Sequence, residues 1–313
     1  MELPRHRFRF GLQASAATDR DAWVALARKA EDLGFATLSV ADHLRDQFAT
    51  TPAMMAAADA TTTLRIASVV WCNDFHHPAM LAKEAATLDV LSGGRLELGM
   101  GAGWMPEDYA QAGIAMDSPG VRIDRLAEAV TVVKGLLSGE PVTFAGDHYR
   151  IDGLVGSPCP VQQPHVPLFL GGGGRRMLTL AGAEADIVGL NIDMRSGRIG
   201  TESGPSATTS ATEAKLGWIA DGAGDRFADI ELQVRVQLAM VTDDPMALAE
   251  ALGPAFGLSA DEALASPHAL VGPLGQLIET CQQRRDQFGI SYVTVPSEAI
   301  DDMAPVVAAL AGT

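Results

Sequence analysis

Cysteine is scarce in this chain, and the few cysteines follow no metal-binding or disulfide pattern. Cys72, Cys159 and Cys281 are the only three among 313 residues, and none forms a CxxC pair. An odd and sparse count is typical of a reducing compartment rather than of a secreted disulfide framework. We therefore expect a cytoplasmic protein.

Long apolar runs are also missing, and so is an excess of positive charge. The N-terminus "MELPRHRFRFG" has no apolar core of signal-peptide length, and no span of about 20 apolar residues follows it. The formal net charge is −16. A field of that sign repels phosphates, which argues against a nucleic-acid or anionic-membrane surface. An anionic ligand would need a local positive site.

Several catalytic signatures are absent as well. The chain has no GxSxG motif, so covalent hydrolysis has no support. It has no HExxH pair, and adjacent histidines such as His76 and His77 rarely chelate one ion. We expect no metal site.

What the chain does contain is an alternation of apolar strands and helices, with a hydrophobic content of 47%. Eight strands separated by helices favour an α/β fold, a closed TIM (β/α)8 barrel with insertions, as one domain over residues 1–313. The strands are expected over 8–13, 37–41, 64–71, 95–103, 167–172, 186–190, 229–241 and 291–296. A hairpin is expected over 142–152. The Gly-, Ser- and Thr-rich stretch within 191–212 is the one candidate for a mobile lid or insertion.

In such a barrel, functional side chains follow the C-terminal ends of the strands. The polar, aromatic and glycine residues at those positions are Asp42, His43, Trp71, Cys72, Asn73, Asp74, His76, His77, Gly101, Gly103, Trp104, Gly171, Gly172, Gly173, Gly174, Arg175, Arg176 and Asn191. Their gathering at one end of the barrel is more informative than any single motif.

The run "FLGGGGRRMLTLAG" (169–182) is a candidate anion site. It matches neither the Walker motif nor GxGxxG. Glycines let backbone N–H groups approach an anion, and the helix that follows directs its positive end to the same place. Arg175 and Arg176 in the first helical turn oppose the helix dipole, and a bound anion would offset that conflict. The alternative is a loop whose glycines only permit tight turning.

Asp42 and His43 are candidates for acid–base chemistry. A histidine can donate a proton near neutral pH, and a neighbouring carboxylate can orient it. Alternatively, Asp42 caps the next segment and His43 packs. Trp104 could wall a flat aromatic cofactor or simply cover the barrel end.

Three segments resemble the luciferase-like flavin and deazaflavin enzymes: "AEDLGFATLSVADHL" (30–44), "ASVVWCNDFHHPAMLAKEAATLDVLSGGRLELGMGAGW" (67–104) and "GEPVTFAGDHYRI…PLFLGGGG" (139–174). The run A-x-L-D-x-L-S-G-G-R-L-x-L-G is specific for that superfamily. "NDFHHP", "GVRIDRLAEA" and "GGGGRRM…EADIVGLN" together resemble a subgroup that uses coenzyme F420. The resemblance implies a TIM barrel with an insertion, a homodimer and a small organic substrate.

By resemblance, Asp42 and His43 lie beside the deazaflavin ring, and His43 supplies a proton. Ser68 and Val69 match the residues that supply a bulge and a non-prolyl cis peptide behind the ring. Gly172, Gly173 and Gly174 match the backbone that holds the cofactor's phosphate. Further cofactor contacts are expected from Trp71, Asn73, Gly103, Trp104, Arg175, Arg176 and Asn191.

The sequence departs from the family's glucose-6-phosphate dehydrogenases in two ways. Trp104 stands where they carry a glutamate, and the chain has only four lysines for a sugar-phosphate pocket, three of them expected in outer helices. A phosphosugar substrate is therefore disfavoured. The leading hypothesis is hydride transfer between F420 and a small organic substrate, by C=C or C=N reduction or alcohol oxidation. The alternatives are an FMN-dependent monooxygenase that uses reduced flavin and O₂, and a non-catalytic flavin-binding protein.

Overall fold

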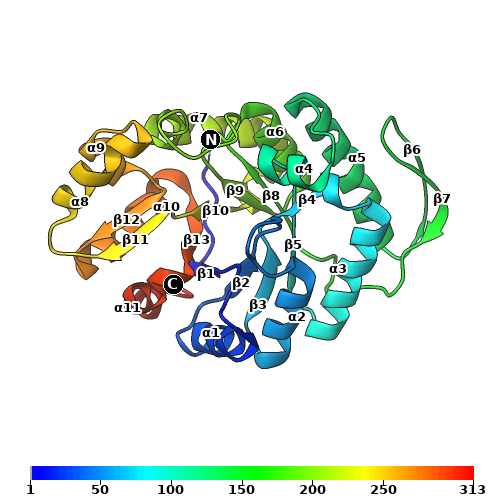
Figure 1. Cartoon of the computed structure of the whole chain (residues 1–313), viewed down its shortest axis with the longest axis horizontal. Coiled ribbons are helices and arrows are strands. Elements are labelled where there is room, and N and C mark those ends of the chain that lie inside the picture. Colours follow the sequence, from blue (N-terminus) through cyan, green and yellow to red (C-terminus); the bar gives the residue numbers. More distant parts are fainter. Residues whose placement is uncertain (1) are drawn as a thin grey trace. The chain divides into compact units, whose positions relative to one another are not determined.

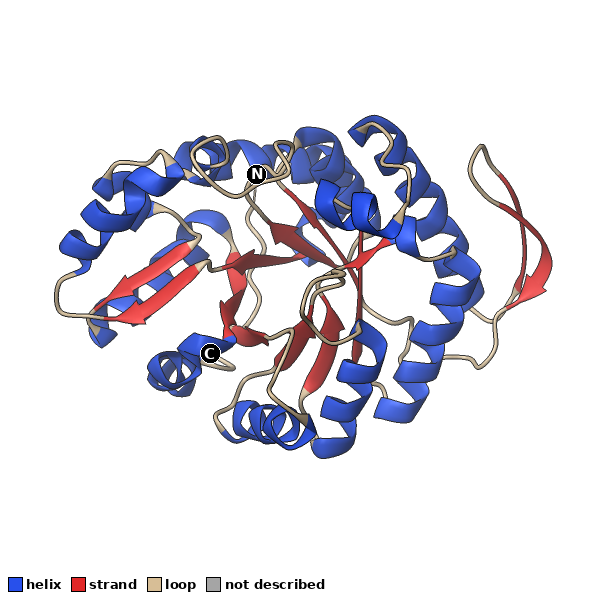
Figure 2. Ribbon diagram, in the orientation of Figure 1, coloured by secondary structure: helices blue, strands red, loops and turns tan. Residues whose placement is uncertain are grey.

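The computed structural model describes residues 2–313 as strands alternating with helices, as the sequence predicts (Figures 1 and 2). The strands are β1 (Arg9–Gln13), β2 (Thr37–Val40), β3 (Arg65–Ser68), β4 (Trp71–Cys72), β5 (Leu96–Gly101), β6 (Pro141–Ala145), β7 (Arg150–Val155), β8 (Leu168–Gly172), β9 (Ile187–Leu190), β10 (Glu231–Arg235), β11 (Leu238–Val241), β12 (Ala269–Gly272) and β13 (Ile290–Pro296).

The α-helices are α1 (Arg20–Asp32), α2 (Thr50–Ala60), α3 (Pro78–Ser92), α4 (Pro106–Ala112), α5 (Pro119–Leu137), α6 (Arg175–Glu184), α7 (Thr209–Ala223), α8 (Pro245–Leu252), α9 (Ala260–Ala265), α10 (Leu274–Phe288) and α11 (Ile300–Leu310). Short 3₁₀ helices are η1 (Asn73–Phe75), η2 (Gly204–Ala207), η3 (Gly224–Asp229), η4 (Gly253–Phe256) and η5 (Ser297–Ala299).

Two predicted strands are each divided in the structure. The run over 64–71 forms β3 and β4, with a cis peptide between Val69 and Val70 in the break. The run over 229–241 forms β10, which pairs with β9 and β13, and β11, which pairs with β12 instead. The predicted hairpin is present as antiparallel β6 and β7.

Helices α2 and α4 and strand β12 are absent from the elements that the sequence predicts. The sequence of α2, TTPAMMAAADA, is rich in small residues and carries no clear apolar stripe. The seven residues of α4 are too few for a helical period to show.

The chain packs as two compact units. The glycine-loop unit contains the described residues up to Ala14, Ala30–Thr37 and Leu170–Thr313. The histidine unit contains Ser15–Lys29 and Leu38–Phe169. The single domain over residues 1–313 stays a prediction, and its first residue lies outside the described range.

Parallel strands β1, β13, β10 and β9 pair in that order in the glycine-loop unit. Their register places Phe10 beside Val293 and Val234 beside Leu190, and all four side chains are buried. Near-continuous apolar strands of this kind are typical of parallel sheets that are covered on both faces.

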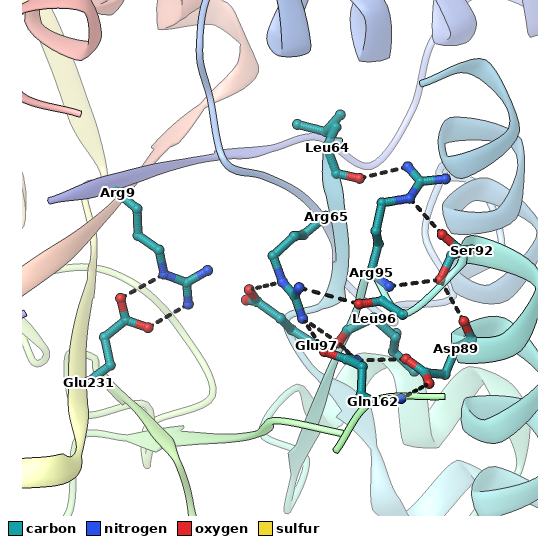
Figure 3. Close-up of polar contacts among 11 residues, drawn as sticks. Arg9, Leu64, Arg65, Asp89, Ser92, Arg95, Leu96, Glu97, Gln162 and Glu231 are labelled. Carbon is teal, nitrogen blue, oxygen red and sulfur yellow. Dashed lines mark hydrogen bonds and ion pairs between the residues drawn. The ribbon is translucent and has the colours of Figure 1, made fainter. Parts of the chain in front are cut away.

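An ion pair links two strands of this sheet that flank β13. Arg9 of β1 donates to both carboxylate oxygens of Glu231 of β10, at 2.6 and 2.5 Å (Figure 3). The Arg9 guanidinium also lies 3.9 Å from the centre of the Tyr292 ring of β13. The bidentate geometry fixes the relative positions of these strands.

Helices α6 and α7 lie side by side in the same unit (Figure 1). A Cβ atom on Gly182 of α6 would lie 2.1 Å from the Ile219 carbonyl oxygen, and one on Gly222 of α7 would lie 2.0 Å from that of Thr179. The two backbones therefore approach closely at both glycines, and any side chain there would separate the helices.

In the histidine unit, β3 and β4 both pair in parallel with β5. Asp89 near the end of α3 anchors the loop at Gln162: its Oδ2 accepts from the Gln162 backbone N–H at 3.1 Å and its Oδ1 from Gln162 Nε2 at 2.6 Å (Figure 3). Gln162 Nε2 also donates to the Leu96 carbonyl at 2.8 Å. The start of β5 is thereby tied to α3.

Two arginines complete this polar network. Arg95 donates to the Ser92 carbonyl at 2.6 Å and to the Leu64 carbonyl at 2.9 Å, and Arg65 donates to buried Glu97 at 2.8 Å (Figure 3). Asp89, Ser92, Arg95 and Glu97 all belong to the A-x-L-D-x-L-S-G-G-R-L-x-L-G run. That run, the clearest mark of the family resemblance, therefore serves the fold by fixing where β3 and β5 begin.

The close approach of α6 and α7 generates a stability prediction. Gly182→Ala should lower the free energy of unfolding by about 1–3 kcal/mol, because its Cβ meets backbone that cannot yield cheaply. Gly217→Ala is the matched control on α7: no atom lies within 4 Å of its Cβ position, so the change should raise stability by about 0.5–1 kcal/mol. Urea denaturation measures both, and equal effects of the two substitutions would contradict the packing.

Candidate functional site

Asp42 follows β2, and both of its carboxylate oxygens accept hydrogen bonds. Oδ1 accepts from Thr50 Oγ1 at 3.1 Å. Oδ2 accepts from the Cys72 backbone N–H at 3.0 Å and from His76 Nε2 at 2.8 Å. One carboxylate thus joins the end of β2 to α2, β4 and the residue after η1, and its histidine partner is His76 rather than the adjacent His43.

The Asp42–His76 pair stabilises a charged imidazole. Burial by itself lowers the pKa of His76, but the hydrogen bond and negative charge of Asp42, with a further contribution from Glu84, outweigh burial and raise it. The raised pKa favours imidazolium beside the carboxylate. His76 therefore serves as the structural partner of Asp42 in this site.

His43 pairs with a different carboxylate. Its Nδ1 lies 2.6 Å from Asp108 Oδ2, and the other oxygen of Asp108 accepts from the Leu44 backbone N–H at 3.3 Å. The Trp104 ring packs edge-on against the imidazole at 5.6 Å. Because a carboxylate only accepts, Nδ1 carries the proton, and among residues 2–313 no group hydrogen-bonds Nε2. Nε2 is the nitrogen available for proton exchange.

Asp108 is missing from the residues that the sequence predicts, although it stands in the segment "GMGAGWMPEDY". Its side chain is only 4% exposed. The available signal was Pro106 at the first position of α4, which predicts a helix start directly after the fourth barrel strand. A carboxylate in that first turn lies near the loops that carry function.

A second cluster surrounds Tyr109 of α4. Its hydroxyl donates to Asp74 Oδ2 at 2.9 Å, and Asp74 Oδ1 accepts from Arg125 at 2.7 Å. Cys72 Sγ lies 3.6 Å from the same hydroxyl, and burial raises the pKa of the Cys72 thiol to about 11, so it stays protonated at neutral pH. Gly103, with φ +74°, passes so close that a Cβ would lie 2.0 Å from the Tyr109 hydroxyl. The cluster shapes the loop after β5.

Ser68 and Val69 lie at the break between β3 and β4. Ser68 Oγ donates to the Gly99 carbonyl at 2.8 Å and accepts from the Gly99 N–H at 2.9 Å. The Val69 N–H donates to the Val40 carbonyl at 2.8 Å. The non-prolyl cis peptide that the resemblance implies is present, and it joins Val69 to Val70.

Three buried side chains of the histidine unit keep polar atoms with no hydrogen-bond partner among residues 2–313. They are Trp71 at Nε1, Asn73 at Oδ1 and Arg122 at Nε and Nη1. Asn73 Nδ2 does donate to the Tyr149 hydroxyl at 3.1 Å. Unpaired buried donors cost free energy that a bound acceptor would recover. Arg122, in the first turn of α5, is a further cationic group, and it is missing from the residues that the sequence predicts.

The four glycines of "GGGG" lie at the end of β8 and before α6. None of the four has a positive φ, so glycine is needed here because it has no side chain and not because the backbone adopts an unusual conformation. A Cβ on Gly173 would lie 2.3 Å from the Ile192 carbonyl oxygen. Gly174 is the N-cap of α6, makes no side-chain cap and has no atom within 4 Å of its Cβ position. The loop can therefore present the first N–H groups of α6 to a ligand.

The residues beside this loop differ in exposure. Arg175 is 71% exposed and lies 3.5 Å from Asp221, a surface pair of small energetic weight. Arg176 is exposed as well. Asn191 follows β9; its N–H donates to the Gly172 carbonyl at 3.0 Å, and its side chain accepts from its neighbour's N–H. Both arginines are thus reachable by an anion, whereas Asn191 serves the local backbone.

Lys215 of α7 ties down the segment expected as a lid. Its buried ammonium donates to the Asn191 carbonyl at 2.7 Å and to the Ser206 carbonyl at 2.5 Å. Burial lowers the pKa of Lys215 to about 8, which Asp193 partly opposes. The lid over 191–212 stays a prediction, and Lys215 is not free to bind a substrate phosphate.

The described residues show no cluster of three His, Cys, Asp or Glu side chains arranged for a metal ion. None of the helices in the same part of the chain has both the length and the apolarity of a membrane span.

Comparison with known proteins decides the family. The luciferase-like monooxygenase family matches residues 6–288. The chain belongs to the luciferase-like monooxygenase family. It is 31% identical over 252 residues to an F420-dependent glucose-6-phosphate dehydrogenase of Nakamurella multipartita, covering 77% of this chain and 70% of that protein. An uncharacterized Mycobacterium bovis protein is 32% identical over 182 residues, and the match spans 51% of this chain and 62% of that relative's length.

A solved structure shares the fold of this luciferase-like chain. It is an F420-dependent secondary alcohol dehydrogenase in complex with an F420–acetone adduct, with a TM-score of 0.77 at 23% identity over 97% of this chain and 99% of that one. The predicted TIM (β/α)8 barrel of the luciferase-like kind is confirmed.

The Asp42–His76 pair predicts a pH-dependent contribution to stability. Because the folded pKa of His76 is raised, the pair should stabilise fully below the unfolded value of about 6.5 and lose that effect as pH rises through the folded pKa. The difference in unfolding free energy between wild type and His76→Gln, from urea titrations, should be larger at pH 6 than at pH 9. A difference that stays constant or grows with pH would rule out a charged His76.

Proposed function

We propose that the chain is an F420-dependent oxidoreductase that transfers a hydride between the deazaflavin and a small organic substrate. The observation that carries the proposal is His43, whose Nδ1 is held by a buried carboxylate while Nε2 stays open. The names of the Nakamurella relative and of the alcohol dehydrogenase of the same fold, both F420-dependent, support the choice of cofactor.

The residues present fit an anionic cofactor. Gly172, Gly173 and Gly174 can offer backbone N–H groups at the N-terminus of α6, and Arg175 and Arg176 supply positive charge there. In the histidine unit, the unpaired N–H groups of buried Arg122 also call for an acceptor. When bound, F420 supplies the hydride chemistry. Contacts from Asp42, Ser68, Val69, Trp71, Asn73, Gly103, Trp104 and Asn191 belong to the same proposal.

His43 exchanges the proton that accompanies hydride transfer, at Nε2. Asp108 fixes the tautomer by accepting the Nδ1 proton, and it stabilises the imidazolium that forms when Nε2 takes up a proton. Trp104 limits rotation of the ring by packing against it. Asp42 acts indirectly, because it holds the segment after β4 through its hydrogen bonds to Cys72 and His76.

The substrate is proposed to be a small neutral molecule rather than a phosphosugar. Lys215, the one lysine expected outside the outer helices, is buried between two backbone carbonyls. Oxidation of an alcohol and reduction of a C=C or C=N bond both need one proton at one position, which His43 can serve. A homodimer and a cytoplasmic location remain part of the proposal.

The rival is an FMN-dependent monooxygenase, because the same fold serves several chemistries. The named relatives favour F420 over FMN. A non-catalytic flavin-binding protein is disfavoured by the open His43 Nε2, since a storage protein has no need for a buried carboxylate that orients a histidine.

Replacing His43 should affect turnover and not cofactor binding. His43→Ala should lower kcat by about 10²–10⁴-fold while the F420 dissociation constant changes little, since general acid–base catalysis is lost. Turnover is followed by deazaflavin absorbance, with the secondary alcohol or conjugated enone on which wild type is most active.

Two further variants sharpen this test. Asp108→Asn should lower kcat, because the amide no longer fixes Nδ1 as the protonated nitrogen of His43. His77→Asn, which can keep the cap of α3, should behave as wild type. Unchanged kcat in His43→Ala would remove His43 from the mechanism.

A further inference from the structure

The glycine-loop unit contains an apolar cavity that the proposed chemistry does not use. Its volume is ≈ 260 Å³. The walls come from η2, β11, α8, η4, α9 and β12, elements that follow the ends of β9 and β10 (Figure 1). Side chains that define it include Leu248, Leu252, Phe256, Leu258 and Val271. At the ~30 Å³ that a water molecule occupies in the liquid, there is room for roughly nine non-hydrogen atoms.

The lining carries no charged side chain. None of the cavity residues, all within the described part of the chain, is Asp, Glu, Lys or Arg. Bringing a charged ligand into such surroundings is strongly unfavourable, because its hydration is not replaced. A neutral and largely apolar occupant is the one that this lining favours.

The wall has four polar side chains, Ser203, Gln237, Ser266 and His268, and the two serines are already paired. Ser203 Oγ bonds the backbone of Gly200 at 2.8 and 3.0 Å. Ser266 Oγ donates to the Ala207 carbonyl at 2.7 Å and accepts from the His268 N–H at 3.2 Å. Both serine hydroxyls thus stabilise the backbone of the cavity wall, and they have little hydrogen-bonding capacity left for a ligand.

His268 is different, because one ring nitrogen is left over. The residue is 5% exposed, and its Nδ1 lies 3.0 Å from the Arg235 carbonyl oxygen. A carbonyl only accepts, so Nδ1 carries the proton. Burial, with the nearby charges of Lys215, Arg284 and Arg235, lowers the pKa of His268 to about 3 and keeps the ring neutral. Nε2 is then a lone-pair acceptor, and no hydrogen bond from any described residue reaches it.

We propose that this cavity binds a neutral aliphatic alcohol of about nine non-hydrogen atoms, whose hydroxyl donates to His268 Nε2 and whose chain packs on the leucine and phenylalanine side chains. Leu252 and Phe256 are 38% and 36% exposed while they line the cavity, so they form its edge. The site does not depend on the proposed oxidoreductase function, because none of its lining residues belongs to the proposed catalytic or cofactor-binding set.

The test compares three probes of equal heavy-atom size or nearly so, by calorimetry on the full chain, with and without F420. 1-Octanol should bind, 1-methoxyheptane should bind at least about 5-fold more weakly because it has no hydroxyl donor, and octanoate should not bind measurably. Equal binding of the alcohol and the ether would overturn the role of His268.

Variants locate the site. Ala249→Phe, which fills the cavity from α8, should weaken 1-octanol binding at least about 10-fold. Leu252→Trp, at the partly exposed edge, should weaken 1-octanol binding to the same extent with less risk to folding. His268→Phe should bring the alcohol down to the affinity of the ether. His43→Ala should leave octanol binding unchanged, which separates this site from the proposed active site. Octanol binding that is lost in His43→Ala, or that persists in both cavity variants, would contradict the proposal.

Discussion

The carboxylate of Asp42 is the contact on which the arrangement of the histidine unit depends. It gathers Thr50, the Cys72 backbone and His76. The next residue, His43, pairs with a different carboxylate, that of Asp108. Two histidine–carboxylate pairs result, with different properties. In the Asp42–His76 pair, Nε2 of His76 contacts the carboxylate, and the pair serves the structure. In the Asp108–His43 pair, Nδ1 of His43 contacts the carboxylate, and Nε2 is left for chemistry.

Positive charge is the second constraint, because the chain as a whole is strongly acidic, with a net charge of −16. An anionic group can be held only where local donors overcome that field. The N-terminus of α6 lacks both a capping side chain and acidic residues in its first turn. Arg175, Arg176 and buried Arg122 each stand at the beginning of a helix, where their own charge opposes the dipole. Such placements are understandable if an anion is to be bound there.

Much of the fold could be predicted from the sequence, and the site only in part. Strand and helix order followed from apolar periodicity, and α6 begins at Arg175, directly after the glycine run, where the pattern predicts. The sequence did not predict the short helix α4, because seven residues are too few to show a helical period. Asp108, which lies in that helix, was therefore not predicted either. The identity of the histidine that pairs with Asp42 could not be read from the chain either, since His43 and His76 are both available and only the path of the backbone after β4 decides between them. The run that most clearly marks the family, around Asp89 and Arg95, turned out to secure strand starts.

If these residues serve a deazaflavin, parallel equilibrium titrations of the purified chain with F420 and with FMN should distinguish the two cofactors. We expect F420 to bind at least about tenfold more tightly than FMN, a difference of about 1.4 kcal/mol. We also expect F420 affinity to fall as salt is raised, because exposed arginines contribute. Tight FMN binding without F420 binding would contradict it.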